Sequence, residues 1–573
     1  MKMEKAKNVL PELLSPCGSL DALTAAVEGG ADAVYFGGTV FNARMNAKNF
    51  DRADVRSAVG YCHENGVKAY VTLNTQIYDR ELKSALDHAA FLYESGADAL
   101  ITADMGLSSL IKKHIPDFEL HASTQATVHN LAGAEKLYDL GFSRVVGARE
   151  MDIDNIRTLC KSRAEIEMFV HGAICVSVSG QCLMSAMLGG RSGNRGQCAQ
   201  PCRMCYNGEY PLSIKDMCLA GHIPSLIDAG VASLKIEGRM KSPAYVYGVT
   251  KIYRRLLDER RAATRDEINE LQRLFSRSGF TDGYYTGNIG KNMLGIRTEN
   301  DIAKTRNEGS FKSGSIKPVE ESVKSAPTIP AKLDFPQKRR TEKAVFTASF
   351  REAGQIPESH NLDITYLPLS KYRNVSTGVP HPPVIFDNEL DGVKHALENA
   401  VKQGAKHVLV HNIGQLDLVR EFGLVPHGSH RLNVFNNYSA DFWQSNGALS
   451  SIILSAELIL PQMRDIILPE GVKKGAIVYG RLPLMTLHKP VEKKNLRDNR
   501  GANFPIYPEE GKDILYNSVN IYMADQLDRL DASGIEERHL IFTGENRGEV
   551  MRVLYAYQHK LPPKEREAIK RIK

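Results

Sequence analysis

The chain has 573 residues, a formal net charge of +6 and 42% hydrophobic residues, a composition ordinary for a soluble globular protein. This length exceeds what one hydrophobic core usually supports, so two large domains are expected. The net charge is too small to indicate a nucleic-acid partner by itself. No apolar run approaches the ~20 residues of a membrane span, and we expect no membrane partner.

From Pro11 onward, short β-rich runs alternate with amphipathic segments of helical period. Segments such as SLDALTAAVEGG carry apolar residues at i, i+3 and i+4 and end near glycine. The β-rich runs are residues 11–16, 33–38, 67–74, 99–104, 119–124, 144–150, 165–172 and 233–239. Eight strands alternating with helices predict a parallel, TIM-like (β/α)8 barrel over residues 9–290.

The carboxyl ends of barrel strands carry the chemistry in this fold. In this chain those ends hold Cys17, Gly37, Gly38, Asn74, Asp104, Ser123, Thr124, Gln125, Arg149, Glu150, His171 and Glu237. Glu237 next to Arg239, and Arg149 next to Glu150, could equally form ion pairs at the barrel rim. His171 could equally be a hydrogen-bonded core histidine. Taken together, these polar residues predict a functional site, whereas each residue alone is weaker evidence for one.

Six of the nine cysteines fall between His171 and Cys218, within a segment rich in glycine and small polar residues. The spacing is Cys175-x6-Cys182-x15-Cys198-x3-Cys202, with Cys205 shortly after. Thiols this dense favour a zinc or iron–sulfur site. Because the segment follows the seventh predicted strand, it is expected to fold over the barrel mouth as an insertion.

Several alternatives apply to these cysteines. Disulfides are disfavoured because the charged start, MKMEKAKNVLPELLSP, does not resemble a secretory signal, and a reduced cytoplasmic location is expected. Simple buried thiols suit Cys62 and Cys160, which lie on predicted helices. The spacing differs from the paired C-x2-C pattern of zinc sites and therefore favours iron and sulfur. Cys198-x3-Cys202-x2-Cys205 has radical S-adenosylmethionine spacing, but lies far downstream of the first strand.

Residues 303–342 lose periodicity, gain lysine, serine and proline, and end near the basic triplet Lys338, Arg339 and Arg340. This composition predicts an extended linker, and we expect mild proteolysis there to release a first fragment that keeps its metal. Residues 343–573 look like a degenerate copy of the first domain. HGSHRLNVFN (427–436) matches HASTQATVHN (121–130), and residues 518–545 follow 213–239 in pattern. The second half is therefore predicted to be a barrel-like domain without cysteines.

The motif HGAICVSVSGQCLMS, followed by GNRGQCAQPCR and LKIEGRMKSP, together with PELLSPCG and GFTDGYYTG, resembles the collagenase-like peptidase family U32. The resemblance covers about residues 9–290, and the second half resembles the additional domain of longer members. It implies a [4Fe-4S] cluster held by Cys175, Cys182, Cys198 and a fourth cysteine. We choose Cys202 for that position, with Cys218 in reserve. Members commonly lack Cys17 and Cys205.

The resemblance implies divided functions. Some members have an attributed proteolytic activity, others hydroxylate transfer or large-subunit ribosomal RNA, and others act in oxygen-independent ubiquinone hydroxylation. The chain shows no HExxH, no G-x-S-x-G and no Cys/His pairing outside the thiol-rich segment, so a collagenase-like metal-dependent peptidase is kept as the alternative. A non-enzymatic scaffold with a structural metal is the third possibility.

We therefore expect cluster-dependent, oxygen-independent hydroxylation of a pyrimidine in RNA. Large-subunit ribosomal RNA cytidine is favoured over transfer RNA uridine, from the resemblance to two-domain members. Glu237, Arg149 and His171 are predicted to orient the base or the oxygen donor, while the second half binds the surrounding RNA. The resemblance further implies a prephenate-derived oxygen donor and an electron-donor protein.

Overall fold

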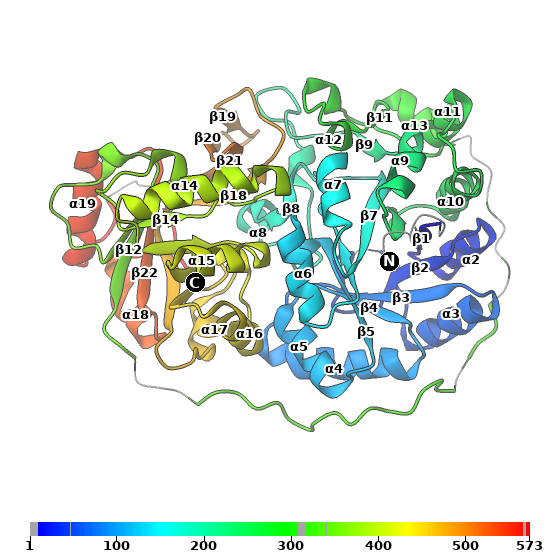
Figure 1. Cartoon of the computed structure of the whole chain (residues 1–573), viewed down its shortest axis with the longest axis horizontal. Helices are drawn as coiled ribbons and strands as arrows, with labels where there is room; N and C mark the ends of the chain where they lie inside the picture. Colours follow the sequence, from blue (N-terminus) through cyan, green and yellow to red (C-terminus); the bar gives the residue numbers. More distant parts are fainter. Residues whose placement is uncertain are drawn as a thin grey trace.

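The computed structural model describes residues 10–45, 47–306, 311, 314, 316–319, 321–337, 341–564 and 569–572. The chain forms two closed barrels of eight parallel strands, which lie side by side in Figure 1. The first barrel runs from blue to green and the second from yellow-green to red. The predicted (β/α)8 barrel and the predicted second barrel are both confirmed. No helix among the described residues is long and apolar enough to cross a membrane.

The first barrel closes where β10 pairs with both β1 and β7. Its strands are β1 (Glu12–Pro16), β2 (Ala33–Gly37), β3 (Lys68–Leu73), β4 (Ala99–Thr102), β5 (Glu119–Ala122), β6 (Arg144–Val146), β7 (Glu165–Gly172) and β10 (Ser233–Ile236). Its outer helices are α2 (Leu20–Glu28), α3 (Arg52–Glu64), α4 (Asp79–Glu94), α5 (Met105–His114), α6 (Leu131–Asp139), α7 (Ile153–Leu159), α9 (Ile223–Asp228) and α10 (Pro243–Asp258). Each predicted β-rich run contains one strand.

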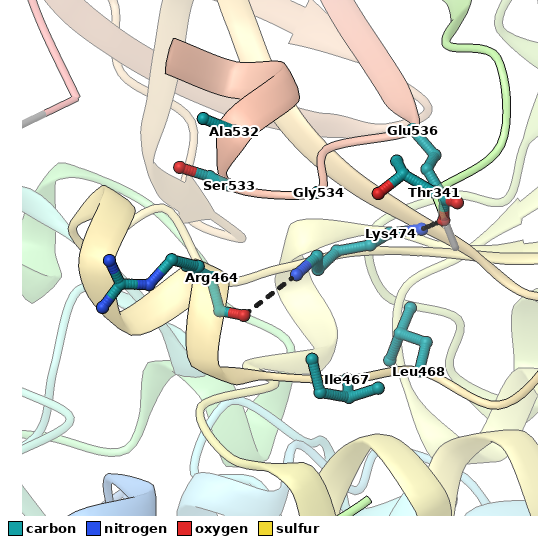
Figure 2. Close-up of a pocket in the computed structure, with 9 residues that line it drawn as sticks. All are labelled: Thr341, Arg464, Ile467, Leu468, Lys474, Ala532, Ser533, Gly534 and Glu536. Atoms are coloured by element: carbon teal, nitrogen blue, oxygen red, sulfur yellow. Dashed lines mark hydrogen bonds between the residues drawn. The ribbon is translucent and has the colours of Figure 1, made fainter. Parts of the chain in front are cut away.

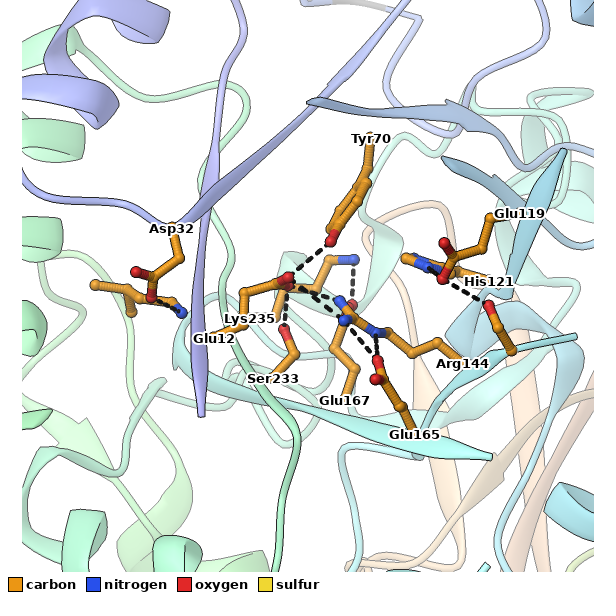
Figure 3. Close-up of polar contacts among 12 residues, drawn as sticks. Glu12, Asp32, Tyr70, Glu119, His121, Arg144, Glu165, Glu167, Ser233 and Lys235 are labelled. Carbon is orange, nitrogen blue, oxygen red and sulfur yellow. Dashed lines mark hydrogen bonds and ion pairs between the residues drawn. The ribbon is translucent and has the colours of Figure 1, made fainter. Parts of the chain in front are cut away.

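The interior of the first barrel contains a buried network of charged residues near the amino ends of its strands (Figure 3). Arg144 lies 2.6 Å from Glu12 and 2.7 Å from Glu165. Lys235 lies 2.6 Å from Glu167, a fully buried carboxylate. Barrel interiors are usually filled by branched apolar side chains. In this barrel, paired charges occupy part of that space, and pairing compensates the cost of burying them.

The cysteine-rich segment leaves β7 and forms β8 (Ser177–Cys182), α8 (Met184–Gly189) and β9 (Asp216–Cys218). β9 returns antiparallel to β7, with His171 opposite Cys218. β8 instead pairs antiparallel with β18 of the second barrel, with Cys182 opposite Met485. The predicted insertion therefore bridges the two barrels.

After the first barrel come α11 (Arg265–Leu274), β11 (Phe280–Thr281), α12 (Gly283–Thr286) and α13 (Glu299–Arg306). The described residues that follow contain no helix or strand before Val345, and they pass along the outer edge of both barrels in Figure 1. The backbone N–H of Val323 donates to Glu94 O at 2.8 Å. The triplet at 338–340 lies outside the described residues. The limits of the linker stay a prediction.

The second barrel closes where β12 pairs with β22. Its strands are β12 (Val345–Phe350), β13 (Ile364–Tyr366), β14 (Gly378–Pro380), β15 (His407–Val410), β16 (Val425–Gly428), β17 (Ser451–Ile453), β18 (Lys473–Leu487) and β22 (Glu537–Phe542). Its helices are α14 (Leu390–Lys402), α15 (Leu416–Phe422), α16 (Asn437–Gly447), α17 (Leu460–Asp465), α18 (Leu527–Ala532) and α19 (Arg547–Gln558). β18 continues beyond the barrel into a sheet with β19 (Asn495–Arg497), β20 (Asn503–Glu509), β21 (Lys512–Tyr522) and β23 (Ile569–Lys570).

The two predicted repeat segments have matching structures. The fifth strand of each barrel, β5 and β16, leads into a short 3-10 helix, Thr124–Ala126 and His430–Leu432 respectively. Each of these helices ends on a residue in the left-handed region, Thr127 (φ 61°) and Asn433 (φ 52°). A residue other than glycine seldom adopts this conformation, so its recurrence at matching positions supports an internal duplication.

Candidate functional site

A cavity that opens to solvent lies at the carboxyl ends of the first barrel's strands. Six residues predicted from strand ends line it: Asn74, Ser123, Thr124, Gln125, Arg149 and Glu237. Tyr35, Ala43, Arg44, Thr72, Ile101, Val146, Phe169, Lys235 and Arg239 complete the lining. This position is where barrel enzymes hold their active sites.

The cavity has more positive than negative charge. Arg44 Nη2 lies 3.3 Å from Glu237 Oε1, and Arg149 Nη2 lies 3.8 Å from Glu237 Oε2. Burial raises the pKa of Glu237, but Arg44 and Arg149 outweigh it and hold that pKa below its usual value. Burial lowers the pKa of Arg239 to about 10, so Arg239 is protonated at neutral pH. Three guanidiniums around one carboxylate favour an anionic ligand.

Three polar atoms of the lining have no hydrogen-bond partner among the described residues: Thr124 Oγ1, Gln125 Oε1 and Arg149 Nε. An unpaired buried polar atom costs roughly 1–3 kcal/mol. A bound molecule that offers both acceptors and donors would satisfy these atoms. Their convergence on one cavity therefore indicates a ligand site.

His171, predicted to orient the base or donor, is not among the residues that line the cavity. It is 1% exposed, and its ring lies edge-on to Phe280 and Tyr253, with Nδ1 3.3 Å from the Tyr253 hydroxyl. Burial and then the charge of Lys241 lower its pKa to about 3, so the ring is neutral. Glu237 and Arg149 therefore share the cavity, whereas His171 is buried on β7, opposite Cys218 of β9. The catalytic role of His171 stays a prediction.

The other strand-end side chains have structural partners. Glu150 does not pair with Arg149: its Oε1 lies 2.5 Å from His129 Nε2, and its Oε2 accepts from Ser179 Oγ at 3.0 Å. Asp104 begins α5 by accepting from the Leu107 backbone N–H at 2.9 Å. Cys17 is buried, with its Sγ 3.7 Å from Ala22 O. These residues support the rim of the cavity.

The four cysteines chosen as ligands are close enough to affect one another's charge. Burial raises the pKa of Cys182, and the thiols of Cys202, Cys198 and Cys175 raise it further. Burial likewise raises the pKa of Cys202 to about 12, with added contributions from Cys175 and Cys198. Four neighbouring thiolates are unfavourable without a compensating cation, which a metal centre supplies.

Cys218 has different neighbours. Its Sγ lies 3.8 Å from the Tyr253 hydroxyl, and it is buried next to β7. Burial raises the pKa of Cys218 to about 11, and none of the other cysteines is among the groups that shift it. This arrangement favours Cys202 over Cys218 as the fourth member of the set.

Among the described residues, no three His, Cys, Asp or Glu side chains are arranged around a single metal ion. One zinc ion would require sulfurs about 4 Å apart, because each Zn–S bond is about 2.3 Å. An iron–sulfur cluster binds each thiolate through a different iron and spaces the sulfurs more widely. Which metal or cluster these thiols hold stays a prediction.

The second barrel holds the cysteine-rich segment. Besides the pairing of β8 with β18, the Leu183 backbone N–H donates to Leu484 O at 2.8 Å. Gln181 Oε1, adjacent to Cys182, accepts from Arg431 Nη1 at 3.0 Å. Farther along, the Asn207 backbone N–H donates to Arg497 O at 2.9 Å. The surroundings of Cys182 are therefore built by both halves of the chain.

A second cavity, of about 480 Å³, lies at the amino ends of strands in the second barrel (Figure 2). Its lysine, Lys474, donates to Met463 O at 2.9 Å and Ile466 O at 2.8 Å, at the end of α17. This end of a barrel serves stability rather than catalysis. The first cavity is the stronger candidate.

Sequence reasoning missed Arg44 and Lys235 and considered Arg239 only as a rim partner. Lys235 could have been found, because alternate residues of a strand face the same side, and Glu237 lies two positions later. Arg44 lies on the loop after β2, and no local pattern predicts which way a loop side chain points.

Comparisons with known proteins found a matching family model and several relatives. The model of Peptidase family U32 matches residues 18–294 and 371–503. The "23S rRNA 5-hydroxycytidine C2501 synthase" of Escherichia coli is 41% identical over 330 residues, which cover 55% of this chain and 49% of that protein. The "tRNA hydroxylation protein P" of Helicobacter pylori is 38% identical over 300 residues, 48% of this chain and 71% of that protein. The "Collagenase" of Porphyromonas gingivalis is 36% identical over 311 residues, 48% of this chain and 73% of that protein.

Proposed function

Because the chain belongs to peptidase family U32, we propose that it is an RNA-modifying enzyme that hydroxylates a pyrimidine with the help of an iron–sulfur cluster and without molecular oxygen. A cytidine of large-subunit ribosomal RNA is the favoured substrate and a transfer RNA uridine the next, following the names of its relatives. One observation carries the proposal: Arg149 contacts both the cavity carboxylate Glu237 and the thiol of Cys175. The cytoplasm, where thiols stay reduced and RNA is present, is the proposed location.

Cys175, Cys182, Cys198 and Cys202 would hold a [4Fe-4S] cluster. Such a cluster supplies one-electron chemistry next to the cavity. Arg149 Nη1 donates to Cys175 Sγ at 3.7 Å, and the charge of Arg203 lowers the pKa of Cys202 against the effect of burial. Hydrogen bonds and positive charges around the sulfurs stabilise thiolate ligands, so these arginines suit a charged cluster.

The cavity would bind the oxygen donor and the reacting edge of the base. Replacing C–H by C–OH removes two electrons from the base, so the donor that gives up its oxygen must accept two electrons. Arg44 and Arg239 would bind an anionic donor, for which a prephenate-derived carboxylate is our candidate. Glu237, ionised and oriented by two arginines, would hold the base or receive its proton. An electron-donor protein would supply the electron that sets the oxidation state of the cluster before the reaction.

The base must leave its stack to reach this cavity, because the strand ends lie beneath the cysteine-rich segment. Enzymes that react with a base inside structured nucleic acid extrude that base or act on single strands. We therefore propose that the substrate is a single-stranded or incompletely folded region of RNA. The second barrel would contact the surrounding RNA.

Deleting the gene in its host and analysing RNA nucleosides by mass spectrometry tests this function. We expect one hydroxylated pyrimidine to disappear from ribosomal RNA, or failing that from transfer RNA. An unchanged nucleoside profile in both RNA classes would contradict the proposal.

A peptidase is the second candidate, because one relative is named a collagenase. Ser179, Glu150 and His129 are adjacent, but Glu150 lies between the other two and the hydroxyl donates to the carboxylate instead of the imidazole. A serine nucleophile needs the imidazole as its immediate base. Gelatin cleavage by purified protein that is lost in Ser179→Ala would nevertheless support the peptidase. Bound zinc without acid-labile sulfide would support a scaffold.

A further inference from the structure

Two arginines lie between the cavity and the cysteine site. Arg149 Nη2 is 3.8 Å from Glu237 Oε2, while its Nη1 donates to Cys175 Sγ at 3.7 Å. Arg44 Nη2 is 3.3 Å from Glu237 Oε1, and its charge also interacts with the thiols of Cys175 and Cys198. The carboxylate and the thiols therefore share the same two cations.

The position of Arg149 is fixed by its surroundings. Its side chain is 10% exposed, and its guanidinium carbon lies 4.3 Å from the centre of the Phe169 ring. Charges in such a partly buried setting interact more strongly than in water and are screened little by salt. Two anionic groups that contact the same guanidinium lie close to each other, so negative charge on one repels negative charge on the other.

We infer that the cavity and the cysteine site, which share contacts with Arg149 and Arg44, are electrostatically coupled, so that negative charge in the cavity makes a cluster on these cysteines harder to reduce. This inference rests on the proposed function for the presence of the cluster. Reduction by one electron, taken from a redox mediator, adds one negative charge and changes no bond to the protein. By linkage, reduction weakens the binding of an anion in the cavity by the same factor. Arg149 is thus a positioning residue with an electrostatic role.

Redox titration of the full-length protein, purified without oxygen, tests the coupling through the midpoint potential. Arg149→Met removes a shared cation, and we expect at least a tenfold smaller reduced-to-oxidised ratio at a given potential, a shift of 59 mV to more negative values. Glu237→Gln removes the competing anion, and we expect a shift to more positive values. Arg149→Lys keeps the charge and is expected to lie between wild type and Arg149→Met.

Arg254→Met is the matched control. Arg254 is a partly buried arginine that pairs with Asp32 at 2.8 Å and Asp258 at 2.7 Å, near the amino ends of the strands. Its substitution is expected to leave the potential unchanged. Opposite shifts for Arg149→Met and Glu237→Gln separate a charge effect from general damage, which would move both in one direction. If Arg149→Met loses its iron, the midpoint potentials of Glu237→Gln and Arg149→Lys decide whether the coupling exists.

This inference alone would be overturned if the cluster is fully occupied and its midpoint potential is the same in wild type, Arg149→Met and Glu237→Gln. A shift in the same direction in both variants would also overturn it. Wild-type protein without iron or sulfide would overturn the proposed function and this inference with it.

Discussion

Asn130 and Asn436 make the same contact from opposite barrels. Asn130 Nδ2 donates to Ile385 O at 3.0 Å, and Asn436 Nδ2 donates to Ile77 O at 2.8 Å. Each asparagine also begins a helix of its own barrel, α6 or α16. The reciprocal pattern is that of a two-fold symmetric dimer interface, formed within one chain.

Neighbouring contacts follow the same symmetry. The Leu131 N–H donates to Asp387 at 3.1 Å, and the Asn437 N–H donates to Asp79 at 2.8 Å. Gly106 and Gly414 let the barrels approach closely, since an added Cβ would lie 2.4 Å from Ser439 N and 2.3 Å from Asn130 Oδ1 respectively. The two barrels therefore form one continuous structure.

Asn436→Ala is expected to lower the free energy of unfolding by about 2–3 kcal/mol. It removes a helix cap, worth about 1 kcal/mol, and the bonds that Nδ2 makes to Ile77 O and to Asp104, at 2.8 Å each. Asn546→Ala is the control, because Asn546 caps α19 without contacting the other barrel. Urea unfolding should show a loss of only about 1 kcal/mol for the control. Equal losses would contradict the interface described here.

The pH dependence of stability provides a second test. Burial raises the pKa of Asp79 to about 6, above its unfolded value of 3.8, despite bonds from Asn437. The folded state therefore holds the proton more tightly, and this stability is present below pH 4 and lost as the pH rises through 6. The stability of Asp79→Asn relative to wild type should rise by on the order of 2–3 kcal/mol between pH 4 and pH 7. A difference that stays constant with pH would contradict the assignment.

Proteolysis should cut the chain between the barrels without separating them. The sequence alone predicted a first fragment that keeps its metal, but the structure argues against this, because β8 pairs with β18 and the asparagine contacts join the barrels. We expect the nicked halves to elute together in gel filtration. After separation in denaturant, the first half alone should fail to retain iron. A freed, iron-containing first half would support the original expectation.

The cysteine set can be tested by substitution. Single alanine variants of Cys175, Cys182, Cys198 and Cys202 should each lose most iron and acid-labile sulfide when purified without oxygen. Cys218→Ala is the informative control, because Cys218 contacts Tyr253 and not the other four thiols. Its iron and sulfide content should match wild type. If Cys218→Ala loses the cluster and Cys202→Ala retains it, then Cys218 and not Cys202 is the fourth ligand.

The order of the strands could be predicted from the sequence because alternating β-rich and helical runs are local patterns, whereas the cysteine set stays a prediction. His171 shows where local patterns fail. The register between β7 and β10 shifts, with Lys235 opposite Phe169 but Ile236 opposite His171. Such a shift interrupts the alternation of sides, so His171 does not follow Phe169 into the cavity. The contact of Gln181 with Arg431 was equally beyond prediction, because it joins residues 250 positions apart.

The proposed role of the four cysteines in RNA hydroxylation is tested by complementing the gene deletion with wild type, Cys182→Ala and Cys218→Ala, followed by mass spectrometry of RNA nucleosides. We expect wild type and Cys218→Ala to restore one hydroxylated pyrimidine, and we expect Cys182→Ala, expressed at the same level, not to restore it. Full restoration by Cys182→Ala would contradict a role for the four-cysteine cluster in the modification.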